Sequence, residues 1–158
     1  MWSKIKPYLI SIIIALAVGG LSAFLTRNNM NIYDRINQPD LAPSPIVFPI
    51  VWTILYTLMG ISSAKIWLQK NEKPELVTDA LFAYVVQLIL NFVWSLIFFN
   101  LQNYLFAFIW LVLLWIVIVI MIMRFYKVSP LAAYLQIPYL IWVTFAGYLN
   151  FMIYLLNP

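Results

Sequence analysis

The stretch that decides the fold runs from Leu81 to Met123 and reads LFAYVVQLILNFVWSLIFFNLQNYLFAFIWLVLLWIVIVIMIM. It contains no Asp, Glu, Lys or Arg. A membrane-spanning helix needs about 20 apolar residues, so this stretch is long enough for two of them. The short polar segment from Asn100 to Asn103 predicts a tight turn between them, which would make the two helices antiparallel neighbours. The bilayer is therefore the expected solvent of this chain.

The sequences on either side extend the same pattern. Hydrophobic residues make up 65% of the chain and charged residues 9%, whereas soluble domains carry about 25% charged residues. We predict an all-α integral membrane protein, a single domain over residues 1–158 that forms a bundle of five transmembrane helices. The expected spans cover about residues 8–26, 46–68, 77–100, 104–126 and 130–156.

The first apolar segment, residues 8–26, has a second interpretation. Lys4 and Lys6 precede it, as in a signal peptide. Its apolar run exceeds the about 7–15 residues of a signal-peptide core, so we favour a retained helix.

The distribution of Lys and Arg predicts the orientation. One side of the predicted bundle carries seven of these residues and the other side only Arg27 and Arg35. The positive-inside rule then places the N-terminus in the cytoplasm and the C-terminus outside. The basic residues lie at helix ends, so the net charge of +4 does not indicate a nucleic-acid partner. The seven are Lys4, Lys6, Lys65, Lys70, Lys73, Arg124 and Lys127.

Two features concern packing and access. Residues 27–45 form the longest link between spans, and links of this length are usually functional or disordered, so we consider it a candidate lid. Small residues recur every four positions in the first span and at Gly60 and Ala64 in the second. Such faces allow close helix approach, either within one bundle or at a homodimer seam. In the first span they are Ser11, Ala15, Gly19 and Ala23.

Several kinds of chemistry are excluded by composition. The chain has no cysteine and no histidine, so we expect no thiolate nucleophile, metal site or required cofactor. The five acidic residues all fall in predicted loops or at helix ends. Proton-coupled transporters generally keep an ionisable residue inside the membrane, which disfavours that class here.

Neutral polar and aromatic residues instead form stripes at helical spacing. The third span carries Tyr84, Gln87, Asn91, Ser95 and Phe98, the second Trp52, Tyr56 and Met59, and the fifth Tyr139, Trp142 and Ala146 with Phe145 adjacent. Turned inward, these faces would enclose an aromatic cavity in which Asn91 is a neutral donor and acceptor. Alternatively, Asn91 and Gln87 only bond neighbouring helices to one another.

These residues resemble the translocator protein family, also called the tryptophan-rich sensory protein (TspO/MBR) family. The resemblance covers about residues 8–156. The matching segments are Val47-Phe48, Val51–Tyr56, Leu58-Met59-Gly60, Gln87, Leu90-Asn91-Phe92, Trp94-Ser95, Phe98-Phe99, Ser129-Pro130, Ala132-Ala133, Pro138-Tyr139, Trp142, Phe145-Ala146 and Leu149-Asn150.

The resemblance implies a five-helix bundle, often dimeric, in a bacterial cell membrane. Its cavity would bind porphyrins, other tetrapyrroles and small lipophilic molecules, with protoporphyrin IX as ligand or substrate. Trp52, Asn91 and Trp142 correspond to pocket residues of the family. The ligand site we predict consists of Trp52, Tyr56, Gln87, Asn91, Trp94, Tyr139, Trp142, Phe145 and Ala146.

The resemblance leads to three functional hypotheses. The first is tetrapyrrole binding with a sensory or regulatory role, in which tryptophan faces stack on the macrocycle and its propionates reach water or Arg35. The second is an enzyme that degrades protoporphyrin IX in light, with Trp52 and Trp142 as catalytic residues. The third is a regulatory scaffold or a transporter of lipophilic ligands. The first loop departs from the family pattern, because Leu41 and Ile46 replace two tryptophans.

Overall fold

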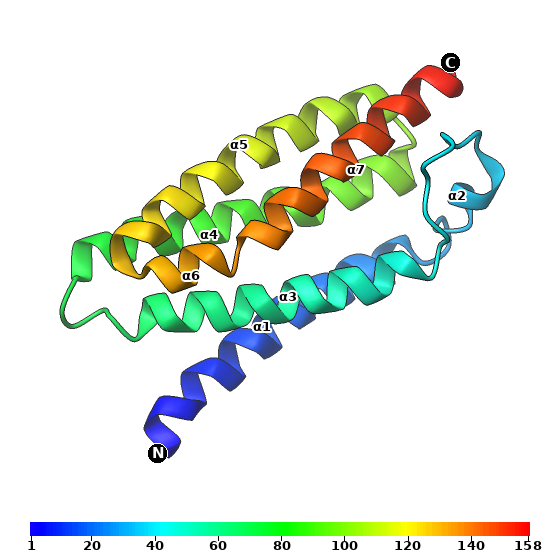
Figure 1. The fold of residues 1–158 in the computed structure, drawn as a ribbon. Coiled ribbons are helices and arrows are strands. Elements are labelled where there is room, and N and C mark those ends of the chain that lie inside the picture. Colours follow the sequence, from blue (N-terminus) through cyan, green and yellow to red (C-terminus); the bar gives the residue numbers. More distant parts are fainter.

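The computed structural model describes residues 1–158, which are almost entirely helical (Figure 1). Five helical segments are long and apolar enough to cross a membrane, which confirms the all-α bundle. The elements are α1 (Trp2–Thr26), α2 (Ile32–Arg35), α3 (Val47–Trp67), α4 (Pro74–Ser95), the π-helical η1 (Leu96–Leu101), α5 (Tyr104–Val128), α6 (Pro130–Tyr134) and α7 (Ile137–Leu156).

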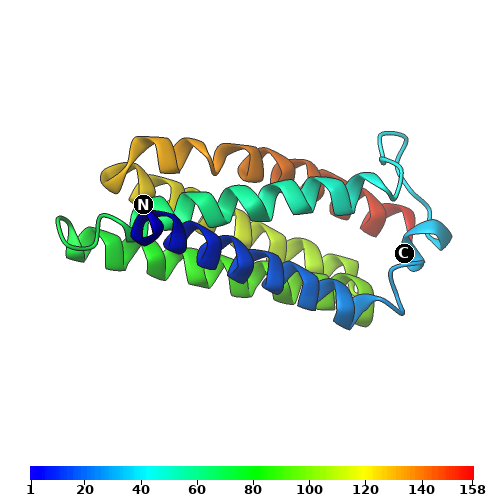
Figure 2. The same cartoon turned by 90° about the horizontal axis from the view of Figure 1, so that it is seen from below.

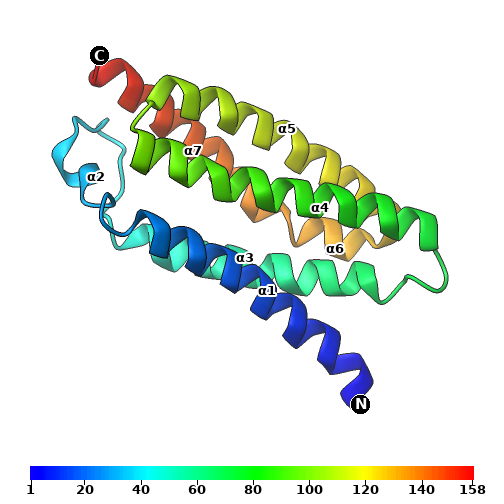
Figure 3. The ribbon, with the colours of Figure 1, turned by 180° about the vertical axis from the view of Figure 1, so that it is seen from behind.

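Three pairs of spanning helices pack extensively on one another. Helix α1 packs on α3, α4 packs on α5, and α5 also packs on α7. The N-terminus and the α3–α4 link lie at one end of the bundle, whereas α2 and the C-terminus lie at the other (Figures 1 and 2). The first turns of α1 diverge from the remaining helices (Figure 3). The long first link and the C-terminus are therefore neighbours.

Local sequence signals explain where the helices end. Gln102 adopts the left-handed conformation, with φ of 53°. The Asn103 side chain accepts a hydrogen bond from the Phe106 amide at 3.1 Å and so caps α5. The predicted tight turn between the third and fourth spans is thus confirmed. Ser129 and Pro130 begin α6 in the same manner, as N-cap and first helical residue.

The fifth span is not one continuous helix. It divides into α6 and α7 at Leu135 and Gln136, just before Pro138 in the first turn of α7. Pro49 likewise lies in the first turn of α3. First-turn N–H groups have no partner within the helix, so Pro49 does not interrupt the hydrogen-bond ladder as an interior proline would. Pro7 is the interior proline, because α1 begins at Trp2 and not near residue 8.

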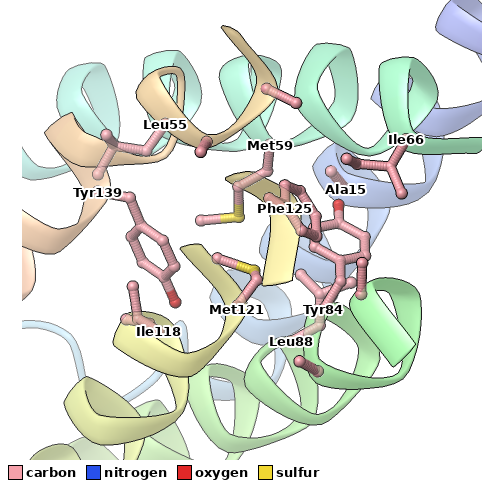
Figure 4. Packing of buried hydrophobic residues seen from close by; sticks show 14 of the residues in the cluster. Ala15, Leu55, Met59, Ile66, Tyr84, Leu88, Ile118, Met121, Phe125 and Tyr139 are labelled. Atoms are coloured by element: carbon pink, nitrogen blue, oxygen red, sulfur yellow. The ribbon is translucent and has the colours of Figure 1, made fainter. Parts of the chain in front are cut away.

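The main core lies between α3, α4, α5 and the α6–α7 segment (Figure 4). Met59 and Met121 are fully buried there, and the Tyr84 ring lies 6.2 Å from that of Phe125. A smaller cluster that includes Tyr33 occupies the end near α2. Residues of both clusters line a cavity at this end of the bundle.

The small residues of α1 and α3 bring these two helices into backbone contact. A Cβ added at Gly60 would lie 2.5 Å from the Ile12 Cα, and one at Gly19 would lie 2.5 Å from the Tyr56 ring. Ala15 is fully buried. This face therefore packs α1 on α3 within one bundle, as the first of the two interpretations expected.

We predict opposite effects of the same substitution at two glycines. Gly60→Ala should destabilise the protein by about 1–3 kcal/mol, because the new methyl group meets the backbone of Ile12. Gly20→Ala is the matched control: a Cβ there meets nothing within 4 Å, and alanine favours a helix by about 1 kcal/mol over glycine. Thermal unfolding in detergent measures both. Equal shifts of the midpoint would contradict the close α1–α3 contact.

Candidate functional site

A cavity of about 410 Å³ lies inside the bundle near the α2 end, a volume in the range of small-molecule sites. Every spanning segment except α5 contributes to it, and part of the α1–α3 link covers it. It is lined by Gly19, Ser22 and Ala23 of α1, Met30, Tyr33 and Pro45 of the link, Phe48, Pro49, Trp52 and Tyr56 of α3, Asn91, Trp94, Ser95, Phe98 and Phe99 of α4 and η1, and Trp142, Ala146, Leu149, Asn150 and Ile153 of α7.

The structure divides the predicted site residues into two groups. Those in the lining are Trp52, Tyr56, Asn91, Trp94, Trp142 and Ala146. Gln87, Tyr139 and Phe145 lie outside it. The polar stripe of the third span therefore points inward along its length, but only its Asn91, Ser95 and Phe98 portion reaches the cavity.

Gln87, Asn91 and Tyr139 form a buried hydrogen-bond chain beneath the cavity. The Asn91 amide Nδ2 donates to the Tyr139 hydroxyl at 3.1 Å, and that hydroxyl donates to Gln87 Oε1 at 2.7 Å. Gln87 Nε2 in turn lies 3.9 Å from the sulfur of Met59. Gln87 and Asn91 thus bond α4 to α7, as the second interpretation of these residues expected. Asn91 also lines the cavity.

A second polar contact fixes the Trp94 ring. The Trp94 indole Nε1 donates to Asn150 Oδ1 at 3.0 Å, and Asn150 Nδ2 donates to the Tyr104 carbonyl at 2.8 Å. Asn150 is 1% exposed, and both of its polar groups are satisfied. Its role in the site was not predicted, although an asparagine inside an apolar span was the available signal.

Trp52 and Trp142 approach the cavity from different helices. The Trp52 ring lies 5.6 Å from the Tyr56 ring and 6.2 Å from the Tyr139 ring. The Trp142 ring contacts Phe48 at 5.9 Å on one side and Phe145 at 5.6 Å on another. Phe145 therefore supports Trp142 from outside the lining. The indole N–H of Trp142 is buried and has no hydrogen-bond partner in the protein.

Tyr33 of α2 is one of three residues of the first link that line the cavity. Its side chain is 7% exposed, and its hydroxyl donates to the Pro43 carbonyl at 2.9 Å. Its ring packs edge-on against Phe48 at 5.0 Å, and the Gln38 side chain donates to its backbone carbonyl. Burial, and secondarily the Asp34 carboxylate, raise the pKa of the Tyr33 hydroxyl above its ordinary value.

Asparagine pairs attach the link to the bundle. The Asn37 amide N–H donates to Asn157 Oδ1 at 2.9 Å, and Asn157 Nδ2 donates to the Asn37 carbonyl at 2.9 Å. We call this pair the asparagine clasp. Asn29 Nδ2 makes a second attachment, to Asn100 Oδ1 at 2.8 Å. The link is therefore held at the C-terminus of α7 and at the end of η1.

Residues that replace the family's loop tryptophans point away from the site. Leu41 is 69% exposed and Ile46 is 64% exposed, and neither lines the cavity. Arg35, expected as a partner for propionates, is exposed on α2 and is also absent from the lining. The structure thus covers the cavity with Met30, Tyr33 and Pro45.

The contribution of α1 was also not predicted. Its small residues were interpreted only as a packing face, yet the same face continues from Gly19 into the cavity wall at Ser22 and Ala23. The lining as a whole offers aromatic faces, the two buried amides of Asn91 and Asn150, and several hydroxyls, with no acid–base pair. Such an arrangement binds flat, apolar molecules with a few polar atoms.

Known proteins match this chain over nearly its full length. Residues 11–156 match the TspO/MBR family. A tryptophan-rich protein TspO of Chlorobaculum tepidum is 41% identical over 92% of each chain. Protein CrtK of Rhodobacter capsulatus is 38% identical over 80% of this chain and 78% of its own, and the human translocator protein is 32% identical over 84% and 79%. The chain, with its five-helix bundle and tryptophan-lined cavity, belongs to the TspO/MBR family.

Proposed function

We propose that this protein binds tetrapyrroles and other small lipophilic molecules in its cavity and thereby serves a sensory or regulatory role in the membrane. The observation that carries the proposal is the convergence of Trp52, Trp94 and Trp142 on one cavity beside Asn91. Indole faces stack on flat aromatic rings. A relative from Cereibacter sphaeroides, 33% identical, is named a tryptophan-rich sensory protein, which supports the sensory part of the proposal.

We predict that Asn91→Leu weakens binding of protoporphyrin IX by roughly 2–13-fold. This range corresponds to the loss of one hydrogen bond of about 0.5–1.5 kcal/mol. The matched control is Gln87→Leu, which cuts the same hydrogen-bond chain outside the lining. Quenching of tryptophan fluorescence measures affinity, and thermal unfolding measures stability. If both variants lose stability but retain wild-type affinity, Asn91 serves only to bond the helices.

A second candidate function is light-dependent degradation of protoporphyrin IX. The observation that favours it is that Trp52 and Trp142 both line the cavity, so both indoles would lie against a bound macrocycle. A photoexcited porphyrin can accept an electron from an indole without any acid, base or metal, and dioxygen would serve as the oxidant. This hypothesis fits a lining without carboxylates.

Trp52→Phe or Trp142→Phe should slow the decay of porphyrin absorbance under light and oxygen by at least severalfold, when the rate is normalised to bound ligand. Phenylalanine keeps an aromatic ring, so affinity should fall only modestly. Trp110→Phe is the control, because the Trp110 indole donates to the Leu90 carbonyl outside the cavity. Equal rates in all four proteins would leave a binding protein without turnover.

We also propose that two copies form a homodimer, as the family resemblance implies. A separate proposal concerns orientation: the N-terminus is cytoplasmic and the α2 end lies outside. The seven-to-two distribution of Lys and Arg supports this orientation. A cysteine introduced at Asp40, which is exposed in the first link, should react with an impermeant maleimide in intact cells. Lys70→Cys should react only after lysis. The reverse pattern would invert the proposed topology.

A further inference from the structure

The cavity wall carries no charge. None of its lining residues is Asp, Glu, Lys, Arg or His. Tyr33 and Tyr56 are its only titratable side chains, and phenols are neutral well above pH 8. The polar groups of the lining side chains are therefore amides, hydroxyls and indole N–H groups. Such groups solvate a neutral polar atom but provide no counter-charge for an ion.

Cations near this end of the bundle do not compensate for the uncharged wall. The Arg27 guanidinium lies 3.9 Å from the centre of the Phe24 ring and donates to the Phe24 carbonyl at 2.6 Å, outside the lining. Arg35 is exposed on α2 beside Asp34. The asparagine clasp holds the link that carries Arg35 against α7. A carboxylate buried in the cavity would thus have no cationic partner.

One unsatisfied group indicates which neutral atoms the site would accept. The Trp142 indole N–H is buried without a partner, although Trp142 lines the cavity. A buried donor without an acceptor is unfavourable, so a ligand that brought an acceptor to this N–H would be favoured. A carbonyl or the neutral form of a carboxyl group supplies one without introducing a charge.

We infer that the cavity selects neutral ligands, so that any carboxyl group of a ligand binds there in its protonated or esterified form. This inference rests on the proposed function and specifies its ligand class: flat, uncharged molecules with a hydrogen-bond acceptor. An ionised carboxylate would have to leave water for a wall without counter-charge, a transfer that proteins avoid by neutralising the group.

Affinity as a function of pH provides the test. Protoporphyrin IX and its dimethyl ester would be titrated into the purified protein in one detergent between pH 5.5 and 7.5. A free carboxyl group with a pKa of about 4.3 is ionised throughout this range. The charged side chains nearest to the cavity residue Tyr33 are those of Asp34 and Arg35, which are exposed and outside the lining. Each buried carboxyl group must then gain a proton on binding. The affinity of the diacid should rise up to tenfold per pH unit for each such group as the pH falls, and that of the ester should stay constant.

A second test adds a positive charge to the cavity lining. Ala23→Lys adds a cation at a lining position of α1, whereas Leu25→Lys adds one two residues away on the same helix, outside the lining. The first variant should raise the affinity for the diacid at pH 7.5 at least tenfold and flatten its pH dependence. The second should leave both unchanged.

The outcomes separate this inference from the proposed function on which it rests. At pH 7.5 we expect the ester to bind at least tenfold more tightly than the diacid. If the diacid binds as tightly as the ester with no pH dependence, neutral selection is overturned while porphyrin binding stands. If neither compound binds, the proposed function fails and the inference fails with it.

Discussion

Hydrocarbon offers no hydrogen bonds, so each polar group inside the bundle needs a partner within the protein. The Tyr139 hydroxyl meets this requirement for α4 and α7 together, because it accepts from Asn91 and donates to Gln87. These two hydrogen bonds lie beneath the cavity and fix the positions of α4 and α7 relative to each other. Along the polar stripe of α4, Asn91 is therefore the first residue, counted from Tyr84, that lines the cavity. The cavity thus extends into the bundle only as far as Asn91, because Gln87 and Tyr139 beyond it are hydrogen-bonded to one another.

The volume of the cavity has a separate origin in small side chains. Gly19 lets the Tyr56 ring lie directly against the backbone of α1. Ser22, Ala23 and Ala146 then continue the wall with little bulk. Close packing on one stretch of α1 and open space on the next are therefore consequences of the same four-residue spacing. A larger residue at Gly19 or Gly60 would force α1 and α3 apart and would change the shape of the cavity.

The sequence predicts the spans well because apolar length alone sets them. It predicts poorly which of the inward-facing residues line the cavity. Helical periodicity assigned Gln87, Asn91 and Tyr139 to inward faces, and all three are buried. Periodicity gives no information on which inward residues touch a cavity and which bond one another beneath it. Tyr33 was missed for another reason: its position depends on contacts such as the asparagine clasp, which joins residues 120 positions apart. The division between α6 and α7 was also missed, because apolar length does not show that Pro138 lies in the first turn of a new helix.

The first link shows how the cavity can be closed without the tryptophans that the family usually places there. An aromatic series runs from Tyr33 to Phe48 and on to Trp142, with each ring edge-on to the next. Hydrogen bonds of Asn29 and Asn37 hold the link to the ends of η1 and α7. Buried aromatic rings and neutral amides thus hold the first link in place, just as they hold α4 and α7 together beneath the cavity. Because these contacts at both ends of the cavity are uncharged, the position of the first link should depend little on salt.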